Sequence, residues 1–126
     1  MWLSQRKRET QHETGGVAQV GRVTLPGNPA GVYLAGERRE VPVFGPGGYC
    51  WRPGLGEEVL VLKTGAAGES PCVAGVRCRG ELAPGEVRIA AEGGGSITLG
   101  ADGTIRLDGT VLVNGAPLTG GQTEDA

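Results

Sequence analysis

The 126-residue chain is poor in aromatic residues, with one Phe, two Trp and two Tyr, and it holds a single histidine. Because His12 is that histidine, a Ser-His-Asp triad or a His-based metal site has nothing to build on within one chain. No pair of a nucleophile and a base can be recognised either. We therefore expect no enzyme, no metal site and no bound cofactor.

Long hydrophobic runs are also missing. No apolar stretch approaches the roughly 20 residues that a membrane-spanning helix needs. The first residues, MWLSQRKRETQHE, have no apolar region after their basic residues, so they do not match a secretory signal. We expect the chain to be made in the cytosol.

Cysteine is scarce, and its three positions match no known pattern. Cys72 and Cys78 are expected on one strand, where six residues span about 20 Å. A disulfide needs Cα atoms about 4.4 to 6.8 Å apart, so we expect no bridge between them. An odd count also favours a reducing compartment. We expect Cys50, Cys72 and Cys78 to be small buried hydrophobic side chains.

Charge is nearly balanced, with a net of −2, but it is unevenly distributed. Residues 85 to 126 contain two basic and six acidic residues. Phosphate binding relies on Lys and Arg, so an acidic distal part argues against nucleic-acid binding there. The basic cluster at residues 6 to 8 either contacts an acidic partner or is a solvated terminus, and the second interpretation is favoured because chain termini are loosely ordered.

Glycine and proline, in contrast, are abundant, with 25 and 8 residues. Residues 85 to 115 read GEVRIAAEGGGSITLGADGTIRLDGTVLVNG, four short runs separated by Gly, Asp and Asn. Turn residues at these positions tolerate positive φ. Apolar residues two apart share one face of a strand. The pattern therefore predicts a common apolar face that contains Val87, Ile89, Ile97, Leu99, Ile105, Leu107, Val111 and Val113.

A single ribbon of this kind would leave both edges unpaired and one apolar face in water. Partners are therefore expected. They could come from a preceding domain, or from identical chains wrapped around a common axis with their apolar faces inward. The second solution covers the edges and the faces together.

The sequence pattern of residues 17–80 predicts five short strands joined by turns. An intervening loop, GPGGYCWRPGLGEE, is too rich in Gly and Pro for regular structure. The apolar run 59–62 is typical of a strand that is covered on both faces. An OB-type barrel or an SH3-like barrel fits this string. The expected strands are Val17 to Leu25, Val32 to Leu34, Glu40 to Phe44, Glu58 to Lys63 and Pro71 to Arg79.

Several segments together resemble the central spike family of phage baseplates, often called baseplate assembly protein V. They are GGVAQVGRVTLPG, Val-Pro-Val at 41–43, the stretch WRPGLGEEVLVL at 51–62, ITLGADGTIRLDG at 97–109 and Val-Asn-Gly at 113–115. The resemblance covers roughly residues 17 to 118. It implies an all-β chain, in which a small OB-type barrel precedes a short intertwined trimeric β-helix needle.

The resemblance further implies a domain plan and a mechanical role. Residues 1–16 are a polar leader, 17–80 the OB-fold barrel, 85–118 the β-helix spike and 119–126 the C-terminal tip. Such spikes are homotrimers that cap the hub and tube of a contractile tail and pierce the target cell envelope. The implied location is the baseplate tip of a virion or tail-like particle that assembles in the bacterial cytoplasm.

The chain also departs from that family. Larger members carry a lysozyme domain between barrel and needle, for which residues 79 to 84 leave no room. Many end in an apical His-x-His iron site, and no histidine follows His12. We therefore expect a minimal spike without an apical metal.

Three roles remain open for the aromatic residues of this region. Trp51 and Arg52 form a candidate contact with the hub or the trimer seam, because a bulky aromatic and a fork-shaped donor are common interface anchors. Alternatively, Trp51 plugs the end of the barrel. In a different functional class, an OB-fold module for single-stranded nucleic acid or carbohydrate uses aromatics beside basic groups. The residues that fit it are Tyr33, Phe44, Tyr49, Trp51, Arg38, Arg39 and Arg52.

Overall fold

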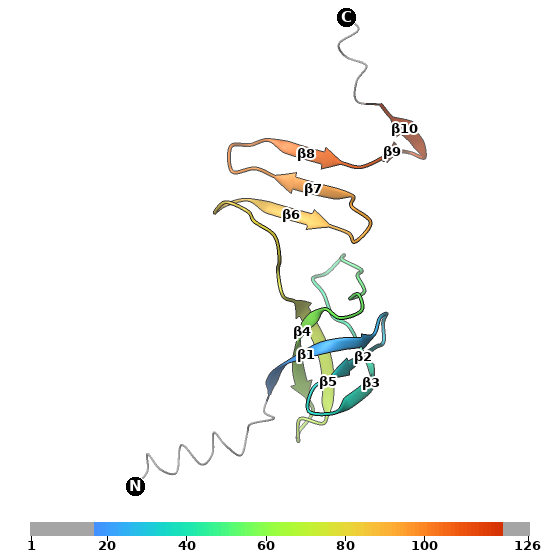
Figure 1. The fold of residues 1–126 in the computed structure, drawn as a ribbon, viewed down its shortest axis with the longest axis vertical. Coiled ribbons are helices and arrows are strands. Elements are labelled where there is room, and N and C mark those ends of the chain that lie inside the picture. Colours follow the sequence, from blue (N-terminus) through green and yellow to red (C-terminus); the bar gives the residue numbers. More distant parts are fainter. Residues whose placement is uncertain (1–16, 120–126) are drawn as a thin grey trace, which may run out of the picture. The chain divides into compact units, whose positions relative to one another are not determined.

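Residues 17–119 are described in a computed structural model (Figure 1). They form an all-β structure of antiparallel sheets, and no helix occurs in this range. The all-β prediction is therefore confirmed. The chain divides into two compact units, Met1–Cys78 (unit 1) and Arg79–Ala126 (unit 2). The predicted leader 1–16 and most of the predicted tip lie outside the described residues.

Unit 1 contains one five-stranded antiparallel sheet with the strand order β3-β2-β1-β4-β5 (Figure 1). Strand β1 lies at its centre and pairs with β2 on one side and β4 on the other. The short strands are separated by Gly and Pro turns, as the composition predicts. The strand bounds are β1 Ala18–Leu25, β2 Ala30–Tyr33, β3 Glu37–Val41, β4 Glu58–Thr64 and β5 Ser70–Val76.

The two outer strands of this sheet approach each other without forming a ladder. One parallel bridge joins Val43 and Val73. The Phe44 N–H donates to the Val73 carbonyl at 2.9 Å, and the Val73 N–H donates to the Pro42 carbonyl at 2.9 Å. Pro42 has no N–H, so it cannot extend a ladder from β3. The sheet is consequently not closed into a barrel.

Two strands, β3 and β5, differ most from the sequence prediction, by three residues at one or both ends. The third strand was expected at residues 40–44, whereas β3 spans Glu37–Val41. Glu40 has a φ of 58°, an irregular conformation for a strand, and the strand stops before Pro42. The fifth strand was expected to reach Arg79, but β5 ends at Val76. Beyond it, the Arg77 N–H still donates to the Glu58 carbonyl at 3.0 Å.

Small β-branched side chains form the core of unit 1. Every valine in this cluster is at most 1% exposed. Valine suits this position because its branched side chain packs well on a pleated surface. The core cluster contains Val23, Ala30, Val32, Val41, Val59, Val61 and Val73.

Strand β4 is not covered on both faces, which corrects the prediction for residues 59–62. Val59 and Val61 point into the core, whereas Leu60 and Leu62 are 44% and 39% exposed. The sheet of unit 1 therefore carries apolar side chains on its outer face as well.

The cysteines also differ from expectation. All three are free, but only Cys72, on β5, is buried. Cys50 lies in an exposed loop, and Cys78 lies just beyond the end of β5. The prediction that all three are buried is wrong for Cys50 and Cys78.

Unit 2 contains two small sheets (Figure 1). A meander of three antiparallel strands has the order β6-β7-β8, and a separate hairpin is formed by β9 and β10. All five strands have three or four residues. Their bounds are β6 Val87–Ala90, β7 Ser96–Leu99, β8 Ile105–Asp108, β9 Val111–Val113 and β10 Ala116–Leu118.

Candidate functional site

The strand register of unit 2 aligns apolar side chains in two rows across the meander. Leu99 of β7 lies opposite Val87 on β6 and opposite Ile105 on β8. Ile97 likewise lies opposite both Ile89 and Leu107. Because side chains alternate between the faces of a sheet, all of these residues share one face. We call this set the apolar face: Val87, Ile89, Ile97, Leu99, Ile105 and Leu107.

The apolar face is open to solvent in the single chain. Its side chains range from 41% exposed at Leu99 to 69% exposed at Ile105. Isolated exposed aliphatic residues are common on protein surfaces, whereas contiguous ones usually mark an interaction site. Six such residues in adjacent rows therefore form a candidate assembly surface.

The opposite face of the meander is polar. Arg88, Thr98 and Arg106 form one row across its three strands. The Arg88 Nε donates to the Thr98 hydroxyl at 3.3 Å, and the Arg106 Nε pairs with Asp108 at 2.9 Å. The sheet is thus strongly two-sided, with one face suited to water and the other to a partner.

The turns of unit 2 use residues that accept their backbone conformations. Gly103 has a φ of 96° in the turn before β8. In the same turn the Thr104 N–H donates to the Asp102 carboxylate at 3.0 Å. This backbone hydrogen bond is the main reason why the pKa of Asp102 is lowered. The β9–β10 turn uses Asn114 and Gly115, with φ of 51° and 83°, as expected of an Asn-Gly hairpin.

Val111 and Val113, which the sequence pattern groups with the other six, lie on the separate hairpin. The register places Val111 opposite Leu118 and Val113 opposite Ala116. Leu118 is 57% exposed and extends the apolar surface of the hairpin. The pattern does not predict β10, because Pro117 is atypical of a strand.

The outer strands of the meander each keep one edge without a partner in that sheet, because β6 and β8 pair only with β7. Unpaired strand edges expose N–H and C=O groups that can pair with another chain. The meander therefore offers two kinds of unsatisfied surface, an apolar face and free edges.

In unit 1, the loop at residues 42–57 (the aromatic loop) holds Trp51 and Arg52, the predicted contact with the hub or the trimer seam. The Trp51 side chain is half-buried against the core cluster, and its Nε1 donates to the Phe44 carbonyl at 3.0 Å. Arg52 is exposed. The structure therefore favours a packing role for Trp51. Sequence reasoning did not single out Leu55, the most exposed large hydrophobic residue of this loop at 68%.

Replacing Trp51 with Ala should destabilise unit 1. The change removes contacts with the core and the hydrogen bond to Phe44. We expect a loss of about 2 to 3 kcal/mol, below the roughly 3 to 5 found for fully buried aromatic residues. Denaturant unfolding monitored by circular dichroism measures it. Trp51→Phe, which keeps most of the packing, should lose about 1 kcal/mol. An unchanged unfolding midpoint in Trp51→Ala would contradict the packing role.

Residues 17–119 contain no group of three or more His, Cys, Asp or Glu side chains that could hold a metal ion. In the same range, no helix is long and apolar enough to cross a membrane. No family model matches the chain, and no curated protein matches it.

Proposed function

We propose that the chain is a structural spike at the tip of a contractile phage tail or a tail-like injection particle. In this role it acts as a homotrimer that caps the hub and tube and pierces the target cell envelope. Unit 1 attaches to the baseplate hub, and unit 2 forms the needle. The chain carries no catalytic step and takes no cofactor.

The observation that carries this proposal is the uncovered apolar face of unit 2. Three copies wound around one axis bury their aliphatic rows against one another and remove them from water. The polar rows of Arg88, Thr98 and Arg106 then face outward. Strand edges of β6 and β8 pair with neighbouring chains in the same arrangement, which covers both unsatisfied surfaces of the meander.

The strand order of unit 1 gives further support. The order β3-β2-β1-β4-β5, with a parallel bridge at Val43–Val73 between its ends, is compatible with a partly open five-stranded Greek-key barrel of the OB type. An OB-type domain before alternating short strands is the arrangement that the sequence resemblance implies for a baseplate spike.

A needle of this kind suits mechanical work. In an intertwined trimer, backbone hydrogen bonds connect different chains and no strand edge is left open. Local unfolding then requires the separation of several chains at once. The function needs stiffness and shape, which the short strands and tight turns of unit 2 provide.

The molar mass in solution tests the trimer. Light scattering on the purified full-length chain should give three times the 12.9 kDa of one chain. The value should persist on dilution to the low micromolar range, because separation re-exposes three apolar faces. A folded species of 12.9 kDa at micromolar concentration would refute the proposal.

An alternative function is an OB-fold module that binds single-stranded nucleic acid or carbohydrate. It is favoured by exposed aromatic side chains in unit 1, with Tyr33, Phe44 and Tyr49 between 54% and 60% exposed. Against it, several arginines of this unit are paired with carboxylates, as in the Arg39–Glu37 and Arg77–Glu58 pairs. Paired guanidinium groups are less free to bind phosphate.

We expect the chain not to retain single-stranded DNA. Fluorescence anisotropy with a labelled oligonucleotide at low salt should show no saturable binding. Binding that weakens steeply as salt is added would support the alternative, because that slope reports contacts with phosphate. Binding to an oligosaccharide array would likewise support the carbohydrate-binding alternative, and we expect none.

A further inference from the structure

The turn between β9 and β10 contains the one Asn-Gly pair of the chain, Asn114 and Gly115. Both residues are exposed, and their φ angles are 51° and 83°. The register pairs Val113 with Ala116, so Asn114 and Gly115 are the central residues of a two-residue hairpin turn. In such a turn the second N–H lies outside the strand ladder. The Gly115 nitrogen is therefore not committed to a cross-strand hydrogen bond.

This pair combines an electrophile with a nearby nucleophile. The asparagine side chain carries an electrophilic amide carbon close to the backbone nitrogen of the next residue. Glycine leaves that nitrogen unshielded, because it has no Cβ. Among the described residues, no atom beyond the chain neighbours lies within 4 Å of the place that a Cβ on Gly115 would take. The turn therefore presents a reactive carbon and an accessible nitrogen together in solvent.

The hairpin that holds this turn is small and has little burial. Strands β9 and β10 have three residues each and form a two-stranded sheet of their own (Figure 1). Leu112 and Leu118 are 60% and 57% exposed. A lone two-stranded hairpin is at best marginally stable in water, so it opens frequently. Opening releases Asn114 from its left-handed conformation and lets the Gly115 nitrogen reach the side-chain carbon.

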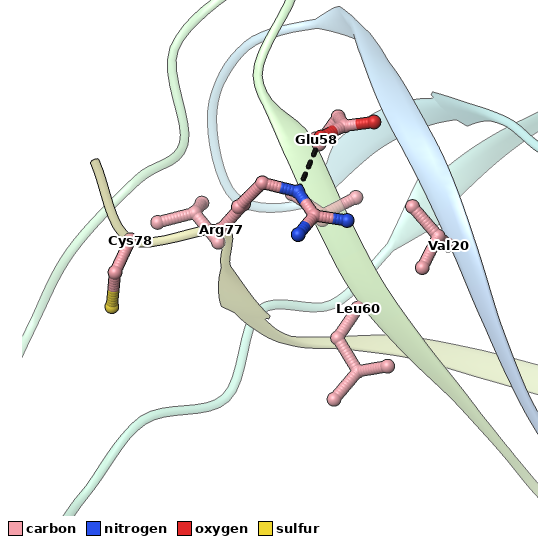
Figure 2. A pocket seen from close by; sticks show the side chains of 7 residues that line it. Val20, Glu58, Leu60, Arg77 and Cys78 are labelled. Carbon is pink, nitrogen blue, oxygen red and sulfur yellow. Dashed lines mark hydrogen bonds and ion pairs between the residues drawn. The ribbon is translucent and has the colours of Figure 1, made fainter.

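The other asparagine, Asn28, lies in unit 1, where additional contacts hold the strand ends. Beside a cavity of about 300 Å³, the ion pair of Arg77 with Glu58 fastens the end of β5 to β4 (Figure 2). The Arg77 N–H also donates to the Glu58 carbonyl at 3.0 Å. Contacts between distant segments raise the free energy of local opening.

Asn28 provides an internal comparison for the chemistry as well. It is exposed like Asn114, but the next residue is Pro29, which has no N–H and cannot act as the nucleophile. Its side-chain oxygen also accepts a hydrogen bond from the Val43 N–H at 3.1 Å. Exposure does not distinguish the two asparagines, whereas the following residue does.

We propose that Asn114 is a site of spontaneous deamidation. The Gly115 nitrogen loses its proton to hydroxide and forms a bond with the Asn114 Cγ, and the side-chain nitrogen takes up a proton and leaves as ammonia. The product is a five-membered succinimide ring. Water then opens the ring at either carbonyl, which gives aspartate or isoaspartate. The net reaction converts asparagine and water into the acid and ammonia.

This modification goes beyond the proposed function and does not rest on the trimer, because every step takes place within one turn of one chain. Both products add a negative charge to unit 2. Isoaspartate also adds one carbon atom to the backbone of the turn. Since the backbone conformation of a two-residue turn fixes the strand register, the added atom disrupts the pairing of β9 with β10.

Ageing of the purified full-length chain in warm, mildly alkaline buffer tests the site. Trypsin yields the peptide 107–126, which contains Asn114, and the peptide 23–38, which contains Asn28. Mass spectrometry should show that 107–126 gains the mass difference between aspartate and asparagine, that fragmentation places it at residue 114, and that two chromatographic forms appear. Peptide 23–38 should stay unchanged. The rate should rise with pH, because the attacking nitrogen must lose its proton.

The same chain in concentrated urea gives the rate without the hairpin. We expect the folded chain to react within about tenfold of that rate, because a lone hairpin opens readily. Conversion in urea without conversion in the folded chain would show that the turn protects Asn114, and would overturn the proposal.

Gly115→Ala, also compared in urea where the turn conformation no longer matters, should react several-fold more slowly, because the added methyl group shields the nitrogen. An unchanged rate in this variant, or equal conversion of Asn28 and Asn114, would remove the Asn-Gly pair as the cause and would equally overturn the proposal.

Discussion

Ile97→Asp should abolish the proposed trimer. Ile97 lies on the central strand of the meander, between Ile89 and Leu107 in the same row. Its replacement puts three carboxylates near a common axis, where they are removed from water without partners. Burial of an unpaired charge is among the most costly single changes in a protein. The molar mass by light scattering should fall from that of a trimer to that of one chain.

The neighbouring residue provides a matched control. Thr98 follows Ile97 on the same strand but lies on the polar face, between Arg88 and Arg106 in the register. Thr98→Asp adds the same charge beside two guanidinium groups, so it should leave the trimeric mass unchanged. Circular dichroism should show that both variants keep the sheet of unit 1. If Ile97→Asp assembled as well as Thr98→Asp, the apolar face would not be the assembly surface.

The sequence predicts the short strands and turns of unit 2, because two local signals agree there, whereas their pairing into a meander within one chain is not predicted. Alternation of apolar and polar residues assigns each side chain to a face, and Gly-containing turns align the strands. Ile97 and Leu99 thereby meet residues of both neighbouring strands. The hairpin that follows is less predictable, since Val111 to Val113 is a continuous apolar run without alternation.

Unit 1 is less predictable, because tertiary contacts decide its strand boundaries. The charged residues Glu37 to Glu40 carry no hydrophobic pattern, yet all four lie in β3 at the edge of the sheet. Residues 42–44, which look like a strand, contribute one bridge to β5 instead of a ladder. The apolar run at 59–62 is open on one face, and a continuous run cannot by itself distinguish one covered face from two.

The environments of the candidate site residues also depend on tertiary contacts that the local sequence does not reveal. Trp51 is conspicuous in the sequence as an aromatic residue within a Gly- and Pro-rich loop, but its environment depends on how the loop folds back on the core. Leu55 is exposed next to Gly56, whose carbonyl accepts a hydrogen bond from Arg22 of β1, a contact between residues that are distant in the sequence. Neither position can be assigned from local pattern alone.

Particles that lack this chain should lose their ability to infect or kill. If the chain leads the tube through the envelope, its removal leaves the tail without the part that transmits the force of contraction to the target. Deletion of its gene, followed by electron microscopy of tails and a plaque or killing assay, measures the effect. We expect a loss of several orders of magnitude in activity, because piercing is an obligatory step.

Complementation of the deletion connects this loss to the molecular surface. The unmodified chain and Thr98→Asp should restore activity, whereas Ile97→Asp should not, because only the first two keep the apolar face intact. A polar-face variant that failed as badly as Ile97→Asp would indicate that assembly is not the defect being measured. Tails that form and act normally without the chain would rule out the piercing role, even for a chain that is trimeric in solution.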